Sequence, residues 1–132
     1  MVRVLLASPH RHLTAALGEY LRAGKVLCEE AASAEELYDH LQRHQWDILI
    51  LDLSLPQHTK LQSVHTLHSR YPTLPILATS LMVNIPAEYW QDAGASGFVP
   101  KAKLSTELIE AVKVISEGGK YFSSEGPAGT IR

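Results

Sequence analysis

The feature that most limits the fold is an uninterrupted apolar run, Ile48-Leu49-Ile50-Leu51, between Asp47 and Asp52. An apolar run without alternation is typical of a strand that is buried on both faces of a parallel sheet. Parallel neighbours have to be joined by crossover connections, usually helices, because a hairpin joins only antiparallel strands. The run therefore predicts an α/β protein with helices on both sides of a central sheet.

Shorter apolar runs alternate with helical stripes along the rest of the chain. Strands are expected at 2–7, 26–31, 47–53, 75–79 and 97–99. Helices are expected at 11–23, 34–41, 61–68, 86–93 and 105–117. This alternation favours an open, doubly wound, five-stranded parallel sheet, flavodoxin-like (βα)5, with strand order 2-1-3-4-5. The length of 132 residues indicates one domain, over residues 1–122, followed by a linker or tail over 123–132.

Sheets of this kind place their functional crevice beyond the carboxyl ends of the strands, where the strand order reverses. The segments expected there are 8–10, 52–54, 79–80 and 100–101. Among their side chains, Asp52 supplies a carboxylate, Lys101 an amine and Ser80 a hydroxyl. A carboxylate at the end of an apolar strand is costly to bury without a partner, and Lys101 is the expected partner.

Four segments follow one another along the chain: Val4–Ala7 with His10, Leu51–Pro56, Ala93–Val99 with Lys101, and Glu117–Phe122. In this order they resemble the receiver domain of two-component response regulators, and most closely the receivers that precede a LuxR-type helix-turn-helix. The resemblance extends from Val2 to about Ser124 and so covers nearly the whole chain.

The resemblance implies a role for each matching residue near the crevice. Asp52 would accept a phosphoryl group from a histidine kinase, and Lys101 would contact the phosphoryl oxygens. Ser80 would be the switch hydroxyl, and Phe98 the aromatic residue whose ring moves with the switch. Ser54 would offer its backbone carbonyl, beside the Asp52 carboxylate, to a magnesium ion.

The chain departs from the family at this metal site. Receivers carry two acidic residues after the first strand, which hold magnesium together with the phosphoaccepting aspartate, and this chain has Ser8 and Pro9 there. Magnesium is held through carboxylates, phosphates and water, and phosphoryl transfer depends on a metal to neutralise the developing charge. A hydroxyl is a poor substitute for a carboxylate, and proline has no side-chain ligand. The sequence thus predicts a degraded magnesium site, reduced to Asp52 and Ser54.

A second departure lies between Ser80 and Lys101, where the chain looks one residue shorter than the family pattern. Ser80 is the fifth residue after Pro75, which is the place of the switch hydroxyl. Thr79 is adjacent to it and is the alternative for that role.

The favoured interpretation is an atypical receiver, a pseudo-receiver, that keeps the fold and Asp52 but is phosphorylated weakly or not at all. It would signal through protein contacts as the regulatory domain of a transcriptional regulator, with a histidine kinase and a second copy of itself as partners. One alternative is a conventional magnesium-dependent phosphoaccepting receiver. Another is a flavodoxin-like module that binds a small ligand in the crevice.

Two neighbouring aromatic residues, Tyr89 and Trp90, fall on the predicted helix at 86–93. In receivers the fourth helix, fifth strand and fifth helix form the usual output and dimerisation face. An exposed Trp90 beside Tyr89 would suit an interface anchor. The alternative is that one of the two rings is buried under the helix.

Two histidines, His10 and His58, are expected near the crevice with Asp52, so a transition-metal site there is a further alternative. An enzyme is not expected. Aspartyl phosphatases of the haloacid-dehalogenase type need a second aspartate two residues after the first, and this chain has Ser54 there.

Charge and hydropathy exclude other classes. Twelve Lys and Arg residues against fourteen Asp and Glu residues give a net charge of −2, which is not the basic footprint of a DNA-binding domain. This domain is not expected to contact DNA, and a C-terminal DNA-binding domain would lie outside the chain. No apolar run approaches the roughly 18 residues that span a membrane. The lone Cys28 forms no internal disulfide, and the N-terminus lacks the pattern of a signal peptide, so a cytoplasmic protein is expected.

Overall fold

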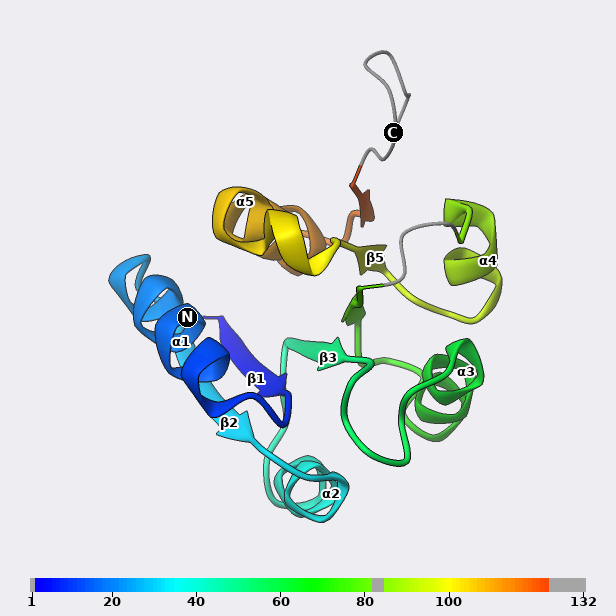
Figure 1. The fold of residues 1–132 in the computed structure, drawn as a ribbon, viewed down its shortest axis with the longest axis horizontal. Helices are drawn as coiled ribbons and strands as arrows, with labels where there is room; N and C mark the ends of the chain where they lie inside the picture. Colours follow the sequence, from blue (N-terminus) through cyan, green and yellow to red (C-terminus); the bar gives the residue numbers. More distant parts are fainter. Residues whose placement is uncertain (1, 82–84, 124–132) are drawn as a thin grey trace.

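The computed structural model describes residues 2–81 and 85–123, and it shows a parallel sheet between two layers of helices (Figure 1). The strands are β1 (Arg3–Ala7), β2 (Leu27–Ala31), β3 (Ile48–Asp52), β4 (Ile76–Thr79), β5 (Gly97–Phe98) and β6 (Tyr121–Phe122). The helices are α1 (Arg11–Ala23), α2 (Ala34–Arg43), α3 (Leu61–Arg70), α4 (Ala87–Asp92) and α5 (Leu104–Ser116), with a 3-10 turn, η1 (Lys101–Lys103), before α5. The α/β class predicted from the central apolar run is confirmed.

The strand order is β2-β1-β3-β4-β5-β6, so the described residues form six strands where the sequence predicts five. The predicted order 2-1-3-4-5 of the first five is confirmed. The additional strand arises because the chain turns back after α5, where Gly118 has a φ of +92° that glycine adopts without strain. Tyr121 then pairs with Gly97 in parallel register. Two residues are too few to show alternation, so the sequence pattern carries no signal for this strand.

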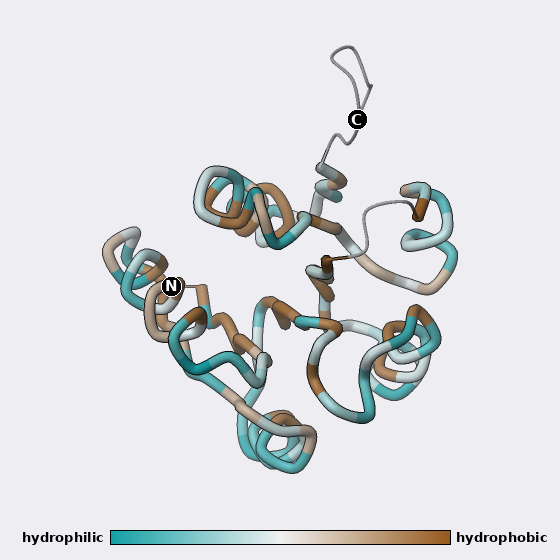
Figure 2. Tube along the Cα trace, viewed as in Figure 1, coloured by the Kyte–Doolittle hydropathy of each residue, from teal (hydrophilic) through white to brown (hydrophobic). Residues whose placement is uncertain are grey.

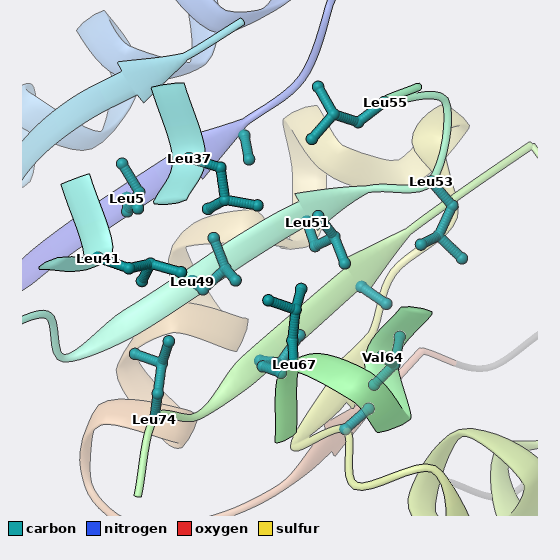
Figure 3. Packing of buried hydrophobic residues seen from close by; sticks show 14 of the residues in the cluster. Leu5, Leu37, Leu41, Leu49, Leu51, Leu53, Leu55, Val64, Leu67 and Leu74 are labelled. Atoms are coloured by element: carbon teal, nitrogen blue, oxygen red, sulfur yellow. The ribbon is translucent and has the colours of Figure 1, made fainter. Parts of the chain in front are cut away.

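The two faces of the sheet have separate cores, because successive side chains of a strand point to opposite faces. Leu49 and Leu51 of β3 pack against α2 and α3, whereas Ile48 and Ile50 pack against α1 and α5. Figure 3 shows the first core, where leucines of α2 and α3 lie over the leucines of β3. Figure 2 shows hydropathy along the chain, with mostly brown apolar residues in the strands and both brown and teal residues on the helices. All five residues of β3 are buried, and the strand ends at Asp52.

Helix α2 begins where the sequence pattern places it. The Ser33 side chain accepts a hydrogen bond from the backbone N–H of Glu36, at 3.1 Å, and the Glu36 carboxylate accepts one from the N–H of Ala32, at 2.8 Å. The first bond satisfies a backbone donor that the first turn of the helix leaves unpaired, and the second ties the residue before the N-cap to that turn. They fix the start of α2 and with it the position of Tyr38 one turn later.

Of the two alternatives for Tyr89 and Trp90, the structure agrees with the second, one ring buried under the helix, and the expectation of Trp90 as an exposed anchor is wrong. Trp90 is fully buried, and its ring stacks on Phe98 with the centroids 4.5 Å apart and the planes 11° apart. Tyr89, the neighbouring residue, is 54% exposed. Helix α4 has six residues, and β5 beneath it has two. The ring of Trp90 fills the space between these two short elements. Trp90 therefore holds α4 against the sheet, and Tyr89 alone of the pair reaches the surface.

This arrangement predicts opposite results for the two adjacent aromatic residues. Trp90→Ala should lower the free energy of unfolding by about 3–5 kcal/mol, because it leaves a large cavity beside Phe98. Tyr89→Ala, the matched control at an exposed position, should change it by about 0.5 kcal/mol or less. Urea unfolding followed by circular dichroism measures both. Equal losses in the two variants would contradict the burial of Trp90.

Candidate functional site

The site is built around Asp52, the last residue of β3, which is fully buried. β3 lies between β1 and β4, and Ala7 of β1 pairs with Leu51 while Thr79 of β4 pairs with Asp52. Ser8 follows Ala7 directly, so the sheet register brings Ser8 beside Asp52. The predicted meeting of strand ends at one edge of the sheet thus holds for these two residues.

Both oxygens of the Asp52 carboxylate accept hydrogen bonds. The Ser8 hydroxyl donates to Oδ2 at 2.7 Å. The backbone N–H of Ser54 donates to Oδ1 at 2.8 Å, and Nζ of Lys101 lies 3.0 Å from the same oxygen. The Ser8 oxygen in turn accepts a bond from the N–H of His10 at 3.1 Å. These donors replace the water that a buried carboxylate loses, which is the condition for keeping it charged.

Lys101 is the cation of this network. It begins the η1 turn shortly after β5, just beyond the carboxyl end of the strand. Its ammonium donates to the Ser54 hydroxyl at 2.6 Å as well as pairing with Asp52, and its backbone N–H donates to the carbonyl of Ser80 at 3.1 Å. The side chain of Lys101 is 12% exposed, and that of Asp52 is 1% exposed. The pair predicted from the sequence is therefore a buried salt bridge.

The two candidates for the switch hydroxyl both lie at the end of β4 and are both buried. Thr79 is the residue in register with Asp52, and its hydroxyl oxygen has no hydrogen-bond partner within residues 2–81 and 85–123. Ser80 is the next residue, and Phe98 lies in the core under Trp90. The roles of Ser80 and Phe98 in a switch stay predictions.

The residues present do not fit a magnesium ion. Asp52 is the one carboxylate among the strand-end residues, and its oxygens are already bound by Ser8, Ser54 and Lys101. Pro9 supplies no ligand. Elsewhere in the described residues, no three His, Cys, Asp or Glu side chains lie close enough together to hold a metal. A hard cation that needs several carboxylate or water ligands is not supported by this donor set.

The two glutamates of β2 and the buried His58 have contacts away from Asp52. Glu29 and Glu30 on β2 lie 3.9 Å from His40 and 3.6 Å from Arg22, respectively. His58 is buried, and its Nε2 lies 3.0 Å from the hydroxyl of Tyr38 on α2. His58 thus belongs to the contact between α2 and the segment after β3, which the sequence pattern did not indicate.

Comparison with known proteins identifies the family that the sequence motifs resemble. The sequence profile of the response regulator receiver domain matches residues 4–113. The chain belongs to the response regulator receiver family. Within residues 2–81 and 85–123, no helix is long and apolar enough to cross a membrane.

The relatives are regulators of transcription. The chain is 30% identical to the transcriptional activator protein ExaE of Pseudomonas putida, over 90% of this chain and 57% of that protein. It is 30% identical to the transcriptional regulatory protein DegU of Brevibacillus brevis, over 71% of this chain and 39% of that protein. The chain therefore spans about half the length of these relatives.

Solved receivers have the same fold. A LuxR-family two-component response regulator from Aurantimonas sp. SI85-9A1 superimposes with a TM-score of 0.81 at 25% identity, over 92% of this chain and 89% of that one. The non-phosphorylated receiver domain of RcsB from Escherichia coli gives a TM-score of 0.82 at 22% identity, over 93% and 98%.

The sequence identified Asp52, Lys101 and Ser54 but treated Ser8 as a lost ligand only. The structure gives Ser8 a positive role, as the hydrogen-bond donor to Asp52. The sequence placed Ser8 and Asp52 at the same edge of the sheet, but the hydrogen bond between them depends on the register of β1 against β3, which the structure supplies. Pro9 has no such contact.

Removal of the cation should destabilise the protein strongly. Lys101→Met leaves the Asp52 charge buried without its ion pair, and we expect a loss of about 3 kcal/mol in the free energy of unfolding. The double variant Asp52→Asn with Lys101→Met removes both charges and should recover most of that loss. Lys113→Met, at an exposed position on α5, is the matched control, with an expected change of about 0.5 kcal/mol or less. Additive losses in a urea-unfolding double-mutant cycle would show that the two charges are not coupled.

Proposed function

We propose that this receiver is the regulatory domain of a LuxR-type transcriptional regulator and that it signals without phosphorylation of Asp52, through contacts with other proteins. The observation that carries the proposal is the 2.7 Å hydrogen bond from Ser8 to Oδ2 of a fully buried Asp52. Where the family has an acidic residue after the first strand, this chain has Ser8, which donates a hydrogen bond to Asp52, the expected phosphoacceptor.

The chemistry of phosphoryl transfer supports this proposal. The attacking oxygen must present a lone pair to phosphorus, and a metal has to neutralise the charge that develops on the phosphoryl oxygens. Here Oδ2 accepts from Ser8, Oδ1 accepts from two donors, and the donor set for a metal is one carboxylate. The hydrogen bond from Ser8 makes Oδ2 a weaker nucleophile, and the lack of further carboxylates leaves the developing charge without a metal to neutralise it. Both features favour a state that does not respond to a phosphodonor.

The place of the domain in a longer regulator follows from its relatives. Two of them are transcriptional regulators, and the aligned part is about half of their length. The DNA-binding function would lie in the other half, since this chain has a net charge of −2 and no basic footprint. A histidine kinase or a second copy of the chain would act as a binding partner in the cytoplasm, and no enzymatic activity is proposed.

A conventional magnesium-dependent receiver is the second candidate. The observation that favours it is the retention of the Asp52–Lys101 pair, at 3.0 Å, at the carboxyl edge of the sheet. The two candidates differ in one property, the acceptance of a phosphoryl group by Asp52.

Acetyl phosphate with magnesium, followed by intact mass measurement, separates the two candidates. We expect no phosphoryl adduct on the wild-type chain, because Asp52 is buried and held by Ser8. An adduct that disappears in Asp52→Asn would establish the conventional candidate and overturn the proposal. Circular dichroism of both proteins confirms that they are folded.

Restoring the acidic pair should restore the chemistry. The double variant Ser8→Asp with Pro9→Asp removes the donor to Oδ2 and adds two carboxylates next to Asp52. We expect this variant to bind magnesium and to gain an adduct with acetyl phosphate that the wild type lacks. The same variant with Asp52→Asn is the matched control and should gain none. If the restored variant is folded and binds magnesium but forms no adduct, the acidic pair is not what prevents phosphorylation.

A further inference from the structure

His58 lies in the segment 53–60 that joins β3 to α3, and it is buried with 5% of its surface exposed. Its backbone N–H donates to the carbonyl of Leu55 at 2.9 Å, and Gln57 before it has a φ of +73°, so the chain makes a tight turn here. The same segment contains Ser54, which donates to Asp52 and accepts from Lys101. One short loop thus joins His58 to the Asp52 network.

The His58 ring has a single hydrogen-bond partner in the part of the chain that the structure describes. Nε2 lies 3.0 Å from the Tyr38 hydroxyl, and the two rings are tilted by 54° with centroids 5.6 Å apart. Nδ1 is buried and has no partner. A neutral imidazole carries one N–H, whereas an imidazolium carries two. Tyr38 can accept only one of them, so the charged ring would leave a buried N–H donor unsatisfied.

Within residues 2–81 and 85–123, no carboxylate lies at hydrogen-bond distance from the His58 ring. On its own segment the charged neighbour is Lys60, which lines the groove beside His58. From α2, Glu35 and Glu36 line the adjacent groove with Tyr38 and Gln57, and Glu36 is bound to the N–H of Ala32. From α3, the Arg70 guanidinium lies 5.2 Å from the centre of the Tyr38 ring.

Burial lowers the pKa of His58 below its usual value and raises the pKa of Tyr38, so the tyrosine hydroxyl keeps its proton. The neutral ring is therefore the form that the fold stabilises.

We propose that His58 is a pH-sensitive latch: its protonation places a second, buried N–H at Nδ1 without an acceptor, displaces the segment 53–60 and, through Ser54, loosens the contact between Asp52 and Lys101. This inference rests on the proposed function, since it supplies an input to the Asp52 network that needs no phosphoryl group. The ligand of the switch is a proton, and the element that moves is the loop after β3.

The direction of the pH dependence follows from the lowered pKa. Below pH of about 6.5, the ordinary value for histidine, the unfolded chain binds a proton that the folded chain does not. The stability held by neutral His58 is therefore present above that pH. It is lost as the pH falls toward the lowered pKa of the folded state.

Nuclear magnetic resonance titration of the whole chain tests the latch. We expect the His58 ring signals to titrate with a midpoint below pH 6.5, and the backbone amide of Ser54 to shift with the same midpoint. In His58→Gln, which retains a hydrogen-bonding side chain, the Ser54 shift should disappear. In His65→Gln, the matched control at an exposed position on α3, it should remain. Tyr38→Phe removes the one acceptor of the charged ring and should move the His58 midpoint to lower pH.

A Ser54 amide that does not shift with His58, or that shifts equally in His58→Gln, overturns the latch. The result of the acetyl phosphate experiment does not depend on the result of this titration. An adduct on Asp52 would overturn the proposed function while leaving the His58 midpoint unchanged, and an invariant Ser54 amide would overturn the latch while leaving the absence of an adduct in place.

Discussion

A carboxylate buried at the end of a central strand has to be neutralised, and the structure around Asp52 follows from that requirement. The strand before it is apolar and buried on both faces, so Asp52 cannot turn to solvent without pulling β3 out of register. Its charge is therefore met where it lies, by a hydroxyl, a backbone N–H and an ammonium from three different parts of the chain. The ends of β1 and β3 and the start of η1 are fixed relative to one another by this one group. The loop after β3 is fixed with them, because Ser54 contacts both charges.

The sequence predicts those parts of the structure whose signal is repeated over many residues. The apolar run 48–51 and the alternation of strands and helices were enough for the class and for the order of five strands. The pairing of Asp52 with Lys101 was also predictable, since a strand-end carboxylate needs a cation. Features that depend on only one or two residues could not be predicted. β6 has two residues, and the burial of Trp90 depends on the space above β5, which no periodicity encodes.

The role of Ser8 shows a different limit of sequence reasoning. Comparison with a family pattern identifies what a position has lost, here a carboxylate, but not what the new side chain does. The hydrogen bond to Asp52 depends on the register of β1 against β3 and on the rotamer of Ser8, which only coordinates supply. His58 is a similar case. Its partner Tyr38 is twenty positions away on α2, and neither residue belongs to a recognisable motif.

The charge balance of the site explains how the acidic pair could be lost without loss of the fold. In the family pattern, three carboxylates face one lysine, and the excess of two negative charges equals the charge of one magnesium ion. In this chain Asp52 and Lys101 balance each other, so the crevice is neutral without a cation. A neutral, hydrogen-bonded pair is stable by itself, whereas an unbalanced acidic cluster is stabilised by the ion it binds. Under the proposed function, Ser8, Asp52 and Lys101 form a structural element in place of a ligand site. A signal that reaches this element then has to act on its hydrogen bonds, including those of Ser54.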